Sequence, residues 1–502
     1  MGLSKSRFIA GWQCLKRLYL EVHQPELAGE PDEPSLAVIE QGQEVGRWAQ
    51  RVFPGGVRIE AGPEEMDKAL KQTEQAVARR QHPALFEATF THENILARVD
   101  ILARLPRNKW RLIEVKSSTG IKEYHLYDVA IQRFILEGLG MRVIPCLMHL
   151  NRGYVYDGER YELEKLFVIR DVTEETAALH QNVKDLIRKE WEALARGKAP
   201  EIEPGSHCTN PFTCEFYDVC NKPLPVDHIA HLPGLSPERF RELASQGIES
   251  IGMIPETFPL KERQKRAREC ARSGKTWFGK GLKDALAGLR YPLYFMDFET
   301  LGVALPRYAG TSPYDPIPFQ WSVHIQRKPG EEPEHYEYLA EGSNDPRPSF
   351  IHALCAVIGK QGSVLAYSRG FESRCLADLA RMLPRHSEQI ENIQGRLWDL
   401  LPVLRAHVYD LAFRGSYSLK RVLPALVPGM TYEGMEIAEG SEAGLAWERM
   451  VQAETGSEER KRLRDALRAY CAQDTLGMVR LLEVLQRACP AALEPPAKRC
   501  AI

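Results

Sequence analysis

Three charged residues on two neighbouring segments of the sequence are suited to chemistry on a phosphate ester. Asp100 lies in ILARVDILARL (95–105), and Glu114 and Lys116 lie in WRLIEVKSS (110–118). If the segments form a hairpin, the period-2 alternation of a strand puts Glu114 and Lys116 on one face, which Asp100 can reach from the other strand. Close carboxylates repel each other unless a hard divalent cation bridges them, and an ammonium group can neutralise charge on a phosphate. The pattern fits metal-assisted phosphodiester hydrolysis, and a salt-bridged surface strand is the simpler alternative.

A second set of carboxylates is spread over the second half of the chain, on a predicted strand and on two predicted helices: Asp297, Glu299, Glu372 and Asp474. Asp297 and Glu299 share one face of the strand because they lie two residues apart. Tyr470 lies four residues before Asp474, which puts both on one face of a helix. Such a set would suit two divalent metal ions that stabilise the attacking and leaving oxygens of a displacement. For the strand pair alone, an ordinary acidic strand end is the alternative.

Three evenly spaced cysteines form a third candidate site. HCTNPFTCEFYDVC (207–220) contains Cys208, Cys214 and Cys220, with five residues between successive cysteines. Metal sites built from soft ligands usually have four of them, so a fourth ligand must come from elsewhere. The remaining cysteines are scattered singly through apolar or helical segments, as in a cytoplasmic protein with reduced thiols.

The elements that must position these residues form a predicted α/β fold with two modules and a connector. Residues 1–222 contain helical segments, then β-type segments, a helix and a strand, and end at the cysteines. Residues 223–290 predict a helical connector, whose basic run KERQKRARECARSGK (261–275) is either a solvated helix or a patch that contacts phosphates. Residues 291–490 predict a second α/β module with a helical end, and 491–502 a frayed tail.

Length and composition agree with two or three domains and no membrane segment. A chain of 502 residues exceeds one hydrophobic core. Lys and Arg (66) nearly balance Asp and Glu (68), so any contact with nucleic acid must come from local basic patches. Apolar runs stay shorter than the ~18–20 residues of a spanning helix, and the N-terminus does not resemble a secretory signal. We therefore expect no membrane partner and a cytoplasmic location.

The pattern of Asp100, Glu114 and Lys116, followed by a predicted helix that carries Gln132, resembles the PD-(D/E)XK nuclease superfamily. Residues 1–222 look more specifically like the RecB-like iron–sulfur nucleases associated with CRISPR adaptation and with exonuclease repair. The resemblance implies a restriction-endonuclease-like fold with Mg²⁺ or Mn²⁺ bound to the two carboxylates. The lysine and the glutamine would complete the catalytic site.

The same resemblance implies a fourth cluster ligand near the N-terminus. Those nucleases place one cysteine there and three after the nuclease core, which implies that Cys14 in GWQCLKRLYLE joins Cys208, Cys214 and Cys220. Zinc sites favour two to four residues between paired ligands, so spacings of five and a distant fourth cysteine fit a [4Fe–4S] cluster better. Zinc and unligated thiols are the alternatives. Such a link would pin the two ends of the module together.

Two positions depart from the pattern of these nucleases. A metal-binding His is common in their first helical motif, and the matching stretch GQEVG has Gly46 there. Glu44 beside it, or Glu87 on the preceding strand, is a candidate to supply a carboxylate instead. The Gln-x-x-x-Tyr helix motif appears here as Gln132 followed by Leu136. The resemblance therefore predicts the central residues and leaves the first metal ligand open.

The second carboxylate set, closed by Tyr-x-x-x-Asp, resembles the tyrosine subtype of the DnaQ-like (DEDD) exonucleases, which have the RNase H-like fold. In that group the four carboxylates would hold the metal ions, and Tyr470 would orient the attacking water. The third carboxylate is usually Asp, whereas this sequence has Glu372. Asp399 and Asp410 are acidic candidates for a supporting role. Lys420 and Arg421 are candidates for phosphate contacts, or else part of a solvated helix end.

The pairing of the two modules resembles a largely uncharacterised bacterial family and covers nearly the whole chain. It predicts a metal-dependent exonuclease that hydrolyses phosphodiester bonds of DNA, single-stranded or at ends, with two candidate active sites. RNA is a possible substrate as well. One alternative keeps only one site active and lets the other bind nucleic acid. Another is a non-catalytic iron–sulfur adaptor that binds nucleic acid.

Overall fold

The computed structural model describes residues 2–489 and has a mixed α/β fold. Residue 490 and the predicted tail 491–502 lie outside the described residues. The chain divides into two compact units, which are described separately. The first contains Met1–Lys222 and Gly302–Asp315, and the second contains Pro223–Leu301 and Pro316–Ile502. No helix of the described part is long and apolar enough to cross a membrane.

The first unit is built on a seven-stranded sheet with the order β2-β3-β4-β5-β6-β7, and β1 pairs with β4. The strands are β1 (Leu3–Ser4), β2 (Val57–Arg58), β3 (Ala84–His92), β4 (Ile95–Leu105), β5 (Lys109–Lys116), β6 (Arg142–Leu150) and β7 (Phe167–Asp171). The antiparallel pairing of β4 and β5, in the register Leu105↔Lys109, confirms the predicted hairpin. Strand β6 runs parallel to β5, so a crossover must connect them, and α5 (Glu123–Gly138) forms it.

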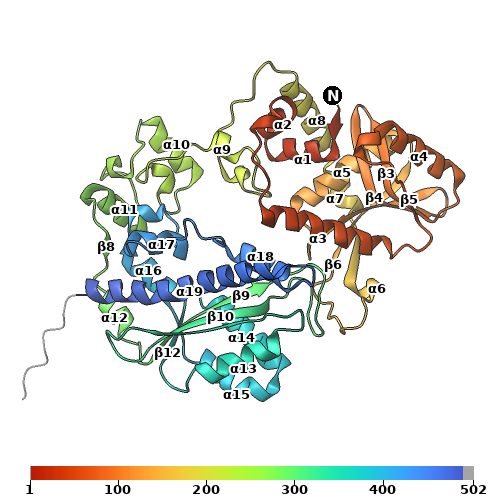
Figure 1. The fold of residues 1–502 in the computed structure, drawn as a ribbon. Helices are drawn as coiled ribbons and strands as arrows, with labels where there is room; N and C mark the ends of the chain where they lie inside the picture. Colours follow the sequence, from red (N-terminus) through yellow and green to blue (C-terminus); the bar gives the residue numbers. More distant parts are fainter. Residues whose placement is uncertain (1, 490–502) are drawn as a thin grey trace, which may run out of the picture. The chain divides into compact units, whose positions relative to one another are not determined.

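Helices cover both faces of this sheet (Figure 1). One face packs against α1 (Lys5–Gln13), α2 (Leu15–His23), α5 and α8 (His180–Leu194). The other face packs against α3 (Glu33–Gln50), together with Ala304 and Leu305 from the inserted segment 302–315. The smaller helices are α4 (Met66–Arg79), α6 (Leu163–Leu166), α7 (Thr173–Ala178) and α9 (Tyr217–Cys220). Leu112 lies in the first core and Ile113 in the second, so the alternation along β5 decides which residues face α1 and α5.

The second unit is built on a five-stranded sheet with the order β11-β10-β9-β12-β13. The strands are β9 (Leu293–Leu301), β10 (Ile317–Gln326), β11 (Glu334–Leu339), β12 (Ser363–Ala366) and β13 (Leu397–Asp399). Strand β10 is antiparallel to β9 and to β11, whereas β12 is parallel to β9 and to β13. Figure 1 shows α13 (Arg347–Val357), α14 (Gly370–Met382) and α15 (Ser387–Gln394) on one side of this sheet, and α18 (Gly440–Val451) and α19 (Ser457–Ala488) on the other.

The predicted connector folds as part of the second unit. It contains α10 (Pro237–Ser245), α11 (Glu262–Ser273), β8 (Trp277–Phe278) and α12 (Leu282–Leu286). Strand β8 pairs with β14 (Val408–Tyr409), which lies between α16 (Leu400–His407) and α17 (Leu419–Leu426). The buried Cys270 of α11 donates its Sγ–H to the carbonyl oxygen of Tyr409, at 3.4 Å. These contacts attach the connector to the segment that leads to α17.

Candidate functional site

The fold of the first unit brings the four residues predicted for its active site together. Glu114 and Lys116 lie on the face of β5 that α5 covers, and Lys116 Nζ donates to Glu114 Oε1 at 2.8 Å. Gln132 on α5 is fully buried and donates from Nε2 to Glu114 Oε2 at 2.8 Å. Asp100 Oδ2 accepts from the backbone N–H of Val115 at 2.8 Å. This hydrogen bond fixes the Asp100 carboxylate beside the residue that follows Glu114.

Two further charged residues complete this cluster and were not predicted from the sequence. Lys5, the first residue of α1, donates from Nζ to both carboxylate oxygens of Glu114, each at 2.9 Å. Asp128 lies on α5 one turn before Gln132, and Lys116 donates a short hydrogen bond to its Oδ2. The i, i+4 spacing of Asp128 and Gln132 could have indicated Asp128, because it puts both residues on one face of a helix. The sequence contains no comparable signal for Lys5, which lies 109 residues from Glu114.

The two ammonium groups set the charge of this cluster. Although burial opposes ionisation of Glu114, Lys116 and Lys5 hold the pKa of its carboxyl well below the usual range. Burial and the neighbouring Glu114 raise the pKa of Asp100 to about 7. The same two causes raise the pKa of Asp128. The cluster therefore has one firmly ionised carboxylate, two that bind protons more readily, and two cations.

The proposed replacements for the missing histidine lie elsewhere. Glu44 is exposed on α3, where its charge acts on the hydroxyl of Tyr161. Glu87 has a φ of 59° and interrupts the pairing of β3 with β4, since residues 86 and 88 pair with 101 and 99 and the register is unchanged. Its carboxylate accepts from Arg98 Nε at 2.9 Å. Asp128, rather than either glutamate, is the third carboxylate beside Asp100 and Glu114.

The second unit gathers its predicted residues where α19 crosses β9. Asp297 and Glu299 lie on the face of β9 that packs against α18 and α19. Among the residues that the structure describes, one set of three potential ligand atoms lies within 4.8 Å of one another, and it comes from Asp297, Glu299 and Cys471. A cavity of about 350 Å³ opens beside them and is lined by Asp297, Tyr367, Ser418, Leu419, Lys420, Glu439, Tyr470, Asp474 and Met478.

Negative charge in this second site is poorly balanced. Burial and repulsion from Asp474 raise the pKa of Asp297 and of Glu299 well above the usual range. Burial also raises the pKa of Asp474 to about 6, although Tyr432 and Lys420 oppose the shift. Glu299 is 5% exposed, and none of the described residues donates a hydrogen bond to its carboxylate, whose oxygens retain some access to solvent. A buried carboxylate without a donor is unfavourable unless another group, such as a cation, satisfies it.

Tyr432 is a member of this site that the sequence did not indicate. Its hydroxyl donates a short hydrogen bond to Asp474 Oδ1, and its ring lies 6.2 Å from that of Tyr470. Lys420 lies close to the site, with its ammonium 5.9 Å from the centre of the Tyr470 ring. Tyr432 lies 42 residues before Asp474 in a segment without a recognisable pattern.

Three other acidic residues have different surroundings from those predicted. Glu372 lies in the first turn of α14 and is 4% exposed, and burial raises its pKa to about 7. Its charge acts on Asp297 and Glu299, but it does not line the cavity. Asp399 accepts from the backbone N–H groups of residues 368, 369 and 401, and so caps the chain. Asp410 accepts from the Thr276 hydroxyl and from the N–H of residue 412, also as a cap.

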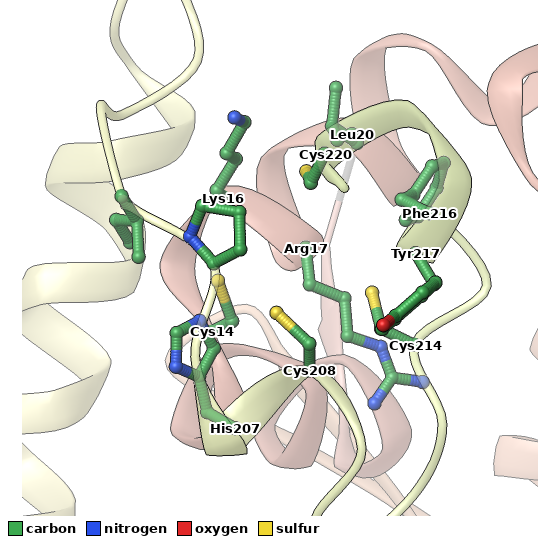
Figure 2. A pocket seen from close by; sticks show the side chains of 12 residues that line it. Cys14, Lys16, Arg17, Leu20, His207, Cys208, Cys214, Phe216, Tyr217 and Cys220 are labelled. Carbon is green, nitrogen blue, oxygen red and sulfur yellow. The ribbon is translucent and has the colours of Figure 1, made fainter. Parts of the chain in front are cut away.

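The four predicted cluster cysteines line one small cavity of the first unit (Figure 2). Cys14 separates α1 from α2 and has extended backbone angles, whereas Cys208, Cys214 and Cys220 come from the segment around α9. Gln13 ties the two parts together, because its Nε2 donates to the carbonyl oxygens of His207 and Phe212 at 2.6 and 2.8 Å.

The sulfur atoms of these cysteines are not gathered at one point. Zn–S bonds of about 2.3 Å in a tetrahedral site would put the sulfurs roughly 3.8 Å apart. Among the described residues, no three of these cysteine sulfurs lie within 4.8 Å of one another. Arg17 and Lys16 line the same cavity and add positive charge beside the thiols. The four thiols lie around one cavity and are soft donors that could hold a metal ion or a cluster.

Comparison with known proteins gave limited matches. Residues 294–418 match a domain of unknown function, DUF2779. No curated protein matched the chain. Among solved structures, the chain is similar to one titled "Crystal structure of SSO0001", with 14% sequence identity over 44% of this chain and 87% of that chain, and a TM-score of 0.21.

Proposed function

We propose that the protein is a metal-dependent nuclease whose main hydrolytic centre is the carboxylate site of the second unit. The observation that carries this proposal is the group of Asp297, Glu299 and Asp474 beside an open cavity, with Lys420 as the nearby cation. Buried like charges are costly, and divalent cations relieve the cost while they polarise a phosphate. The carboxylates of Asp297 and Glu299 have oxygens within 4.8 Å of each other, which fits such a cation.

The topology of the second unit supports its assignment as an RNase H-like domain of the DEDD type. Three antiparallel strands continue into two parallel ones, and the carboxylates lie on the first strand and on the last helix. Asp297, Glu299 and Asp474 would hold Mg²⁺ or Mn²⁺, which would supply a Lewis acid and a more acidic bound water. Glu372 is the fourth carboxylate of that assignment and would act from behind the first three.

The residues around the cavity have separate roles in this proposal. The Tyr470 hydroxyl orients the attacking water, since it shares a helical face with Asp474. Tyr432 holds Asp474 in place and in its ionised form through the hydrogen bond from its hydroxyl. Lys420 faces the same cavity and neutralises charge on the phosphate that is cleaved. The cavity receives the end of a strand, which favours an exonuclease acting on DNA or RNA ends.

The first unit is proposed to have the PD-(D/E)XK-type nuclease fold with a second, subordinate site. Asp100 and Glu114 are the metal-binding candidates there, and Lys116 and Gln132 complete the set. Lys5 covers both oxygens of Glu114 at 2.9 Å, so a metal ion must compete with an ammonium group for them. This contact favours the reading in which the first site mainly binds nucleic acid and cleaves weakly.

The cysteine centre is proposed to hold a [4Fe–4S] cluster through Cys14, Cys208, Cys214 and Cys220. The cluster would join the α1–α2 corner to the segment around α9 and would have a structural role. Free thiols and an oxygen-sensitive cluster suit a reducing compartment, so we also propose a cytoplasmic location.

Anaerobic purification followed by nuclease assays tests the proposal. The visible spectrum is recorded, and end-labelled single- and double-stranded DNA and RNA are incubated with Mg²⁺ or Mn²⁺. We compare the wild type with Asp100→Ala, Asp297→Ala, the double variant and the control Asp465→Ala, an exposed aspartate on α19. We expect Asp297→Ala to lose most of the cleavage, Asp100→Ala to retain it, and the control to match the wild type. Full cleavage by Asp297→Ala would refute the main site.

A further inference from the structure

Three exposed arginines of the second unit have no carboxylate partner. Arg263 lies on α11, Arg414 follows the short helix η7 (Leu411–Phe413), and Arg421 lies on α17. In the described part of the chain, none of the three guanidinium groups forms an ion pair or a side-chain hydrogen bond. We call these three residues the arginine track. Unpaired surface arginines are fully available to a ligand with negative charge.

Most of the predicted basic run 261–275 is not available in this way. Arg268 and Arg272 both pair with Glu256, and Arg268 is 8% exposed. Arg266 donates to the carbonyl oxygen of Ala406 at 2.7 Å and lies over the Trp277 ring. These arginines fasten α11 to the rest of the second unit. The run as a whole is therefore a packed helix, and Arg263 is the arginine of the run that stays unpaired.

Packing brings the arginine track onto one surface. Gln264, next to Arg263, donates from Nε2 to the carbonyl oxygen of Pro233 at 3.1 Å. The guanidinium of Arg263 lies over Gly234, where an added Cβ would be 2.9 Å from Nη2 and where φ is +64°. Glycine suits this left-handed backbone and leaves room for the guanidinium. Helix α11 and the turn at residues 233–234 thus form one edge of the surface.

The segment after η7 forms the adjoining edge. Gly415 packs on the same turn, since an added Cβ there would be 2.8 Å from the carbonyl oxygen of His231. After burial, the charges of Arg414, His228 and Arg421 are the causes that lower the pKa of His231. Arg414 and Arg421 therefore both lie within electrostatic reach of His231, beside the turn that Arg263 covers.

One end of the arginine track lies one residue away from a residue that lines the cavity of the candidate active site. Arg421 directly follows Lys420, which lines that cavity with Ser418 and Asp474. The carboxylates closest to this path are already engaged. Asp410 accepts from the Thr276 hydroxyl and a backbone N–H, and Glu439 lies 3.8 Å from Lys420 Nζ. The path thus carries positive charge although the whole chain has a net charge of −2.

We propose that Arg263, Arg414 and Arg421 bind the sugar–phosphate backbone of a nucleic-acid strand whose end lies in the cavity beside Asp474. The inference rests on the proposed nuclease function and adds the surface that guides the substrate. A row of separate cations suits a ligand with a regular series of single negative charges, which a phosphodiester backbone provides. Binding through backbone phosphates gives little dependence on sequence.

Salt-dependent binding tests the arginine track. Fluorescence anisotropy with labelled 20-nucleotide dT and rU strands is measured in metal-free buffer, where no cleavage occurs, over a range of salt concentrations. The triple variant Arg263→Gln, Arg414→Gln, Arg421→Gln is compared with the wild type. Each lost contact to a single strand lowers the slope of log K against log salt by about 0.7, so three lower it by about 2. At about 0.1 M salt this corresponds to a loss of affinity on the order of 100-fold.

Two controls separate the track from net charge and from misfolding. Lys328→Gln, Lys360→Gln, Arg385→Gln removes three exposed charges elsewhere on the same unit and should retain the wild-type slope. Replacing the three track arginines with lysine keeps the charges and should restore most of the slope. A glutamine variant with the wild-type slope, or a charge control that loses as much affinity, would overturn the proposal.

A small substrate distinguishes failure of the track from failure of the proposed function. Bis(p-nitrophenyl) phosphate has no polymer backbone, so its hydrolysis by the wild type with Mn²⁺ reports on the hydrolytic centre and not on the track. A wild type that binds strands through the three arginines but hydrolyses neither substrate refutes the nuclease proposal and leaves the track supported. A wild type that binds no strand refutes the track, whatever the hydrolysis shows.

Discussion

The hydrogen bond from Tyr432 to Asp474 makes a strong prediction about metal binding by the second unit. Both side chains are buried, with 7% and 8% exposure, and the phenol hydroxyl donates to Asp474 Oδ1. Tyr432→Phe keeps the ring and its contact with Tyr470 and removes a single donor. In the variant, the positive charge that still lowers the pKa of Asp474 would come from Lys420.

The size of the effect follows from the strength of that bond. A hydrogen bond to a charged group contributes about 1.5–3 kcal/mol, which equals roughly 1–2 pKa units. The pKa of Asp474 is about 6 with Tyr432 present, so we expect roughly 7–8 in the variant. Protons compete with a metal ion for the carboxylate, so affinity falls as the pH drops through this pKa. The variant should bind Mn²⁺ on the order of tenfold more weakly near pH 6.5 and almost normally near pH 9.

Metal titrations over this pH range decide the matter. Mn²⁺ binding is followed by electron paramagnetic resonance, and the half-saturating Mn²⁺ for hydrolysis of bis(p-nitrophenyl) phosphate is measured in parallel. Tyr409→Phe is the matched control, because its buried hydroxyl has no partner among the described residues. If Tyr432→Phe follows the wild-type pH profile, Tyr432 does not control the ionisation of Asp474 and the reasoning is wrong.

Three shorter predictions concern the first unit. Burial raises the pKa of Glu190 to about 9, and neither of its oxygens has a hydrogen-bond partner among the described residues. Between about pH 4.5 and 9 the carboxyl ionises in the unfolded chain but not in the folded one, so the free energy of unfolding should fall by about 1.4 kcal/mol per pH unit. Calorimetry should therefore show the advantage of Glu190→Gln over the wild type growing by about 3 kcal/mol from pH 4.5 to 7, and a constant difference would contradict the assignment. Cys14→Ser should lose the visible absorption of the cluster and lower the melting temperature, whereas an unchanged spectrum would exclude Cys14 as a ligand. In an Asp297→Ala background, where only the first site could cleave, Lys5→Met should raise the rate of cleavage. A further Asp100→Ala change should abolish this gain. If Lys5→Met gives no gain, Lys5 does not compete with the metal.

Local patterns explain which parts of the fold and the sites could be predicted. Alternation along β5 put Glu114 and Lys116 on one face, and the i, i+4 spacing put Tyr470 and Asp474 on one side of α19. Both patterns depend on residues close in sequence, and the structure has both. The pairing of β4 with β5, which carry Asp100 and Glu114, could also be predicted, because both segments are rich in apolar residues.

The residues that could not be predicted are those brought in by distant contacts. Lys5 reaches Glu114 only because α1 packs on the same face of the sheet as α5. Glu87 has a left-handed φ at a position where the sequence has no glycine to predict it, and its carboxylate pairs with Arg98. Arg268 and Arg272 looked available in the basic run, but Glu256 lies in another segment and neutralises them.

Charge balance gives a reason for two different carboxylate sites in one chain. In the first unit, Asp100, Glu114 and Asp128 face two ammonium groups, so one divalent cation and one phosphodiester would bring the total to zero. In the second unit, three carboxylates face Lys420, which also lies near Glu439. One divalent cation leaves no excess positive charge there for a phosphodiester, whereas a second one supplies it. Under the proposed function, the second site would need two metal ions to hold a substrate, and the first would hold one with the help of its lysines.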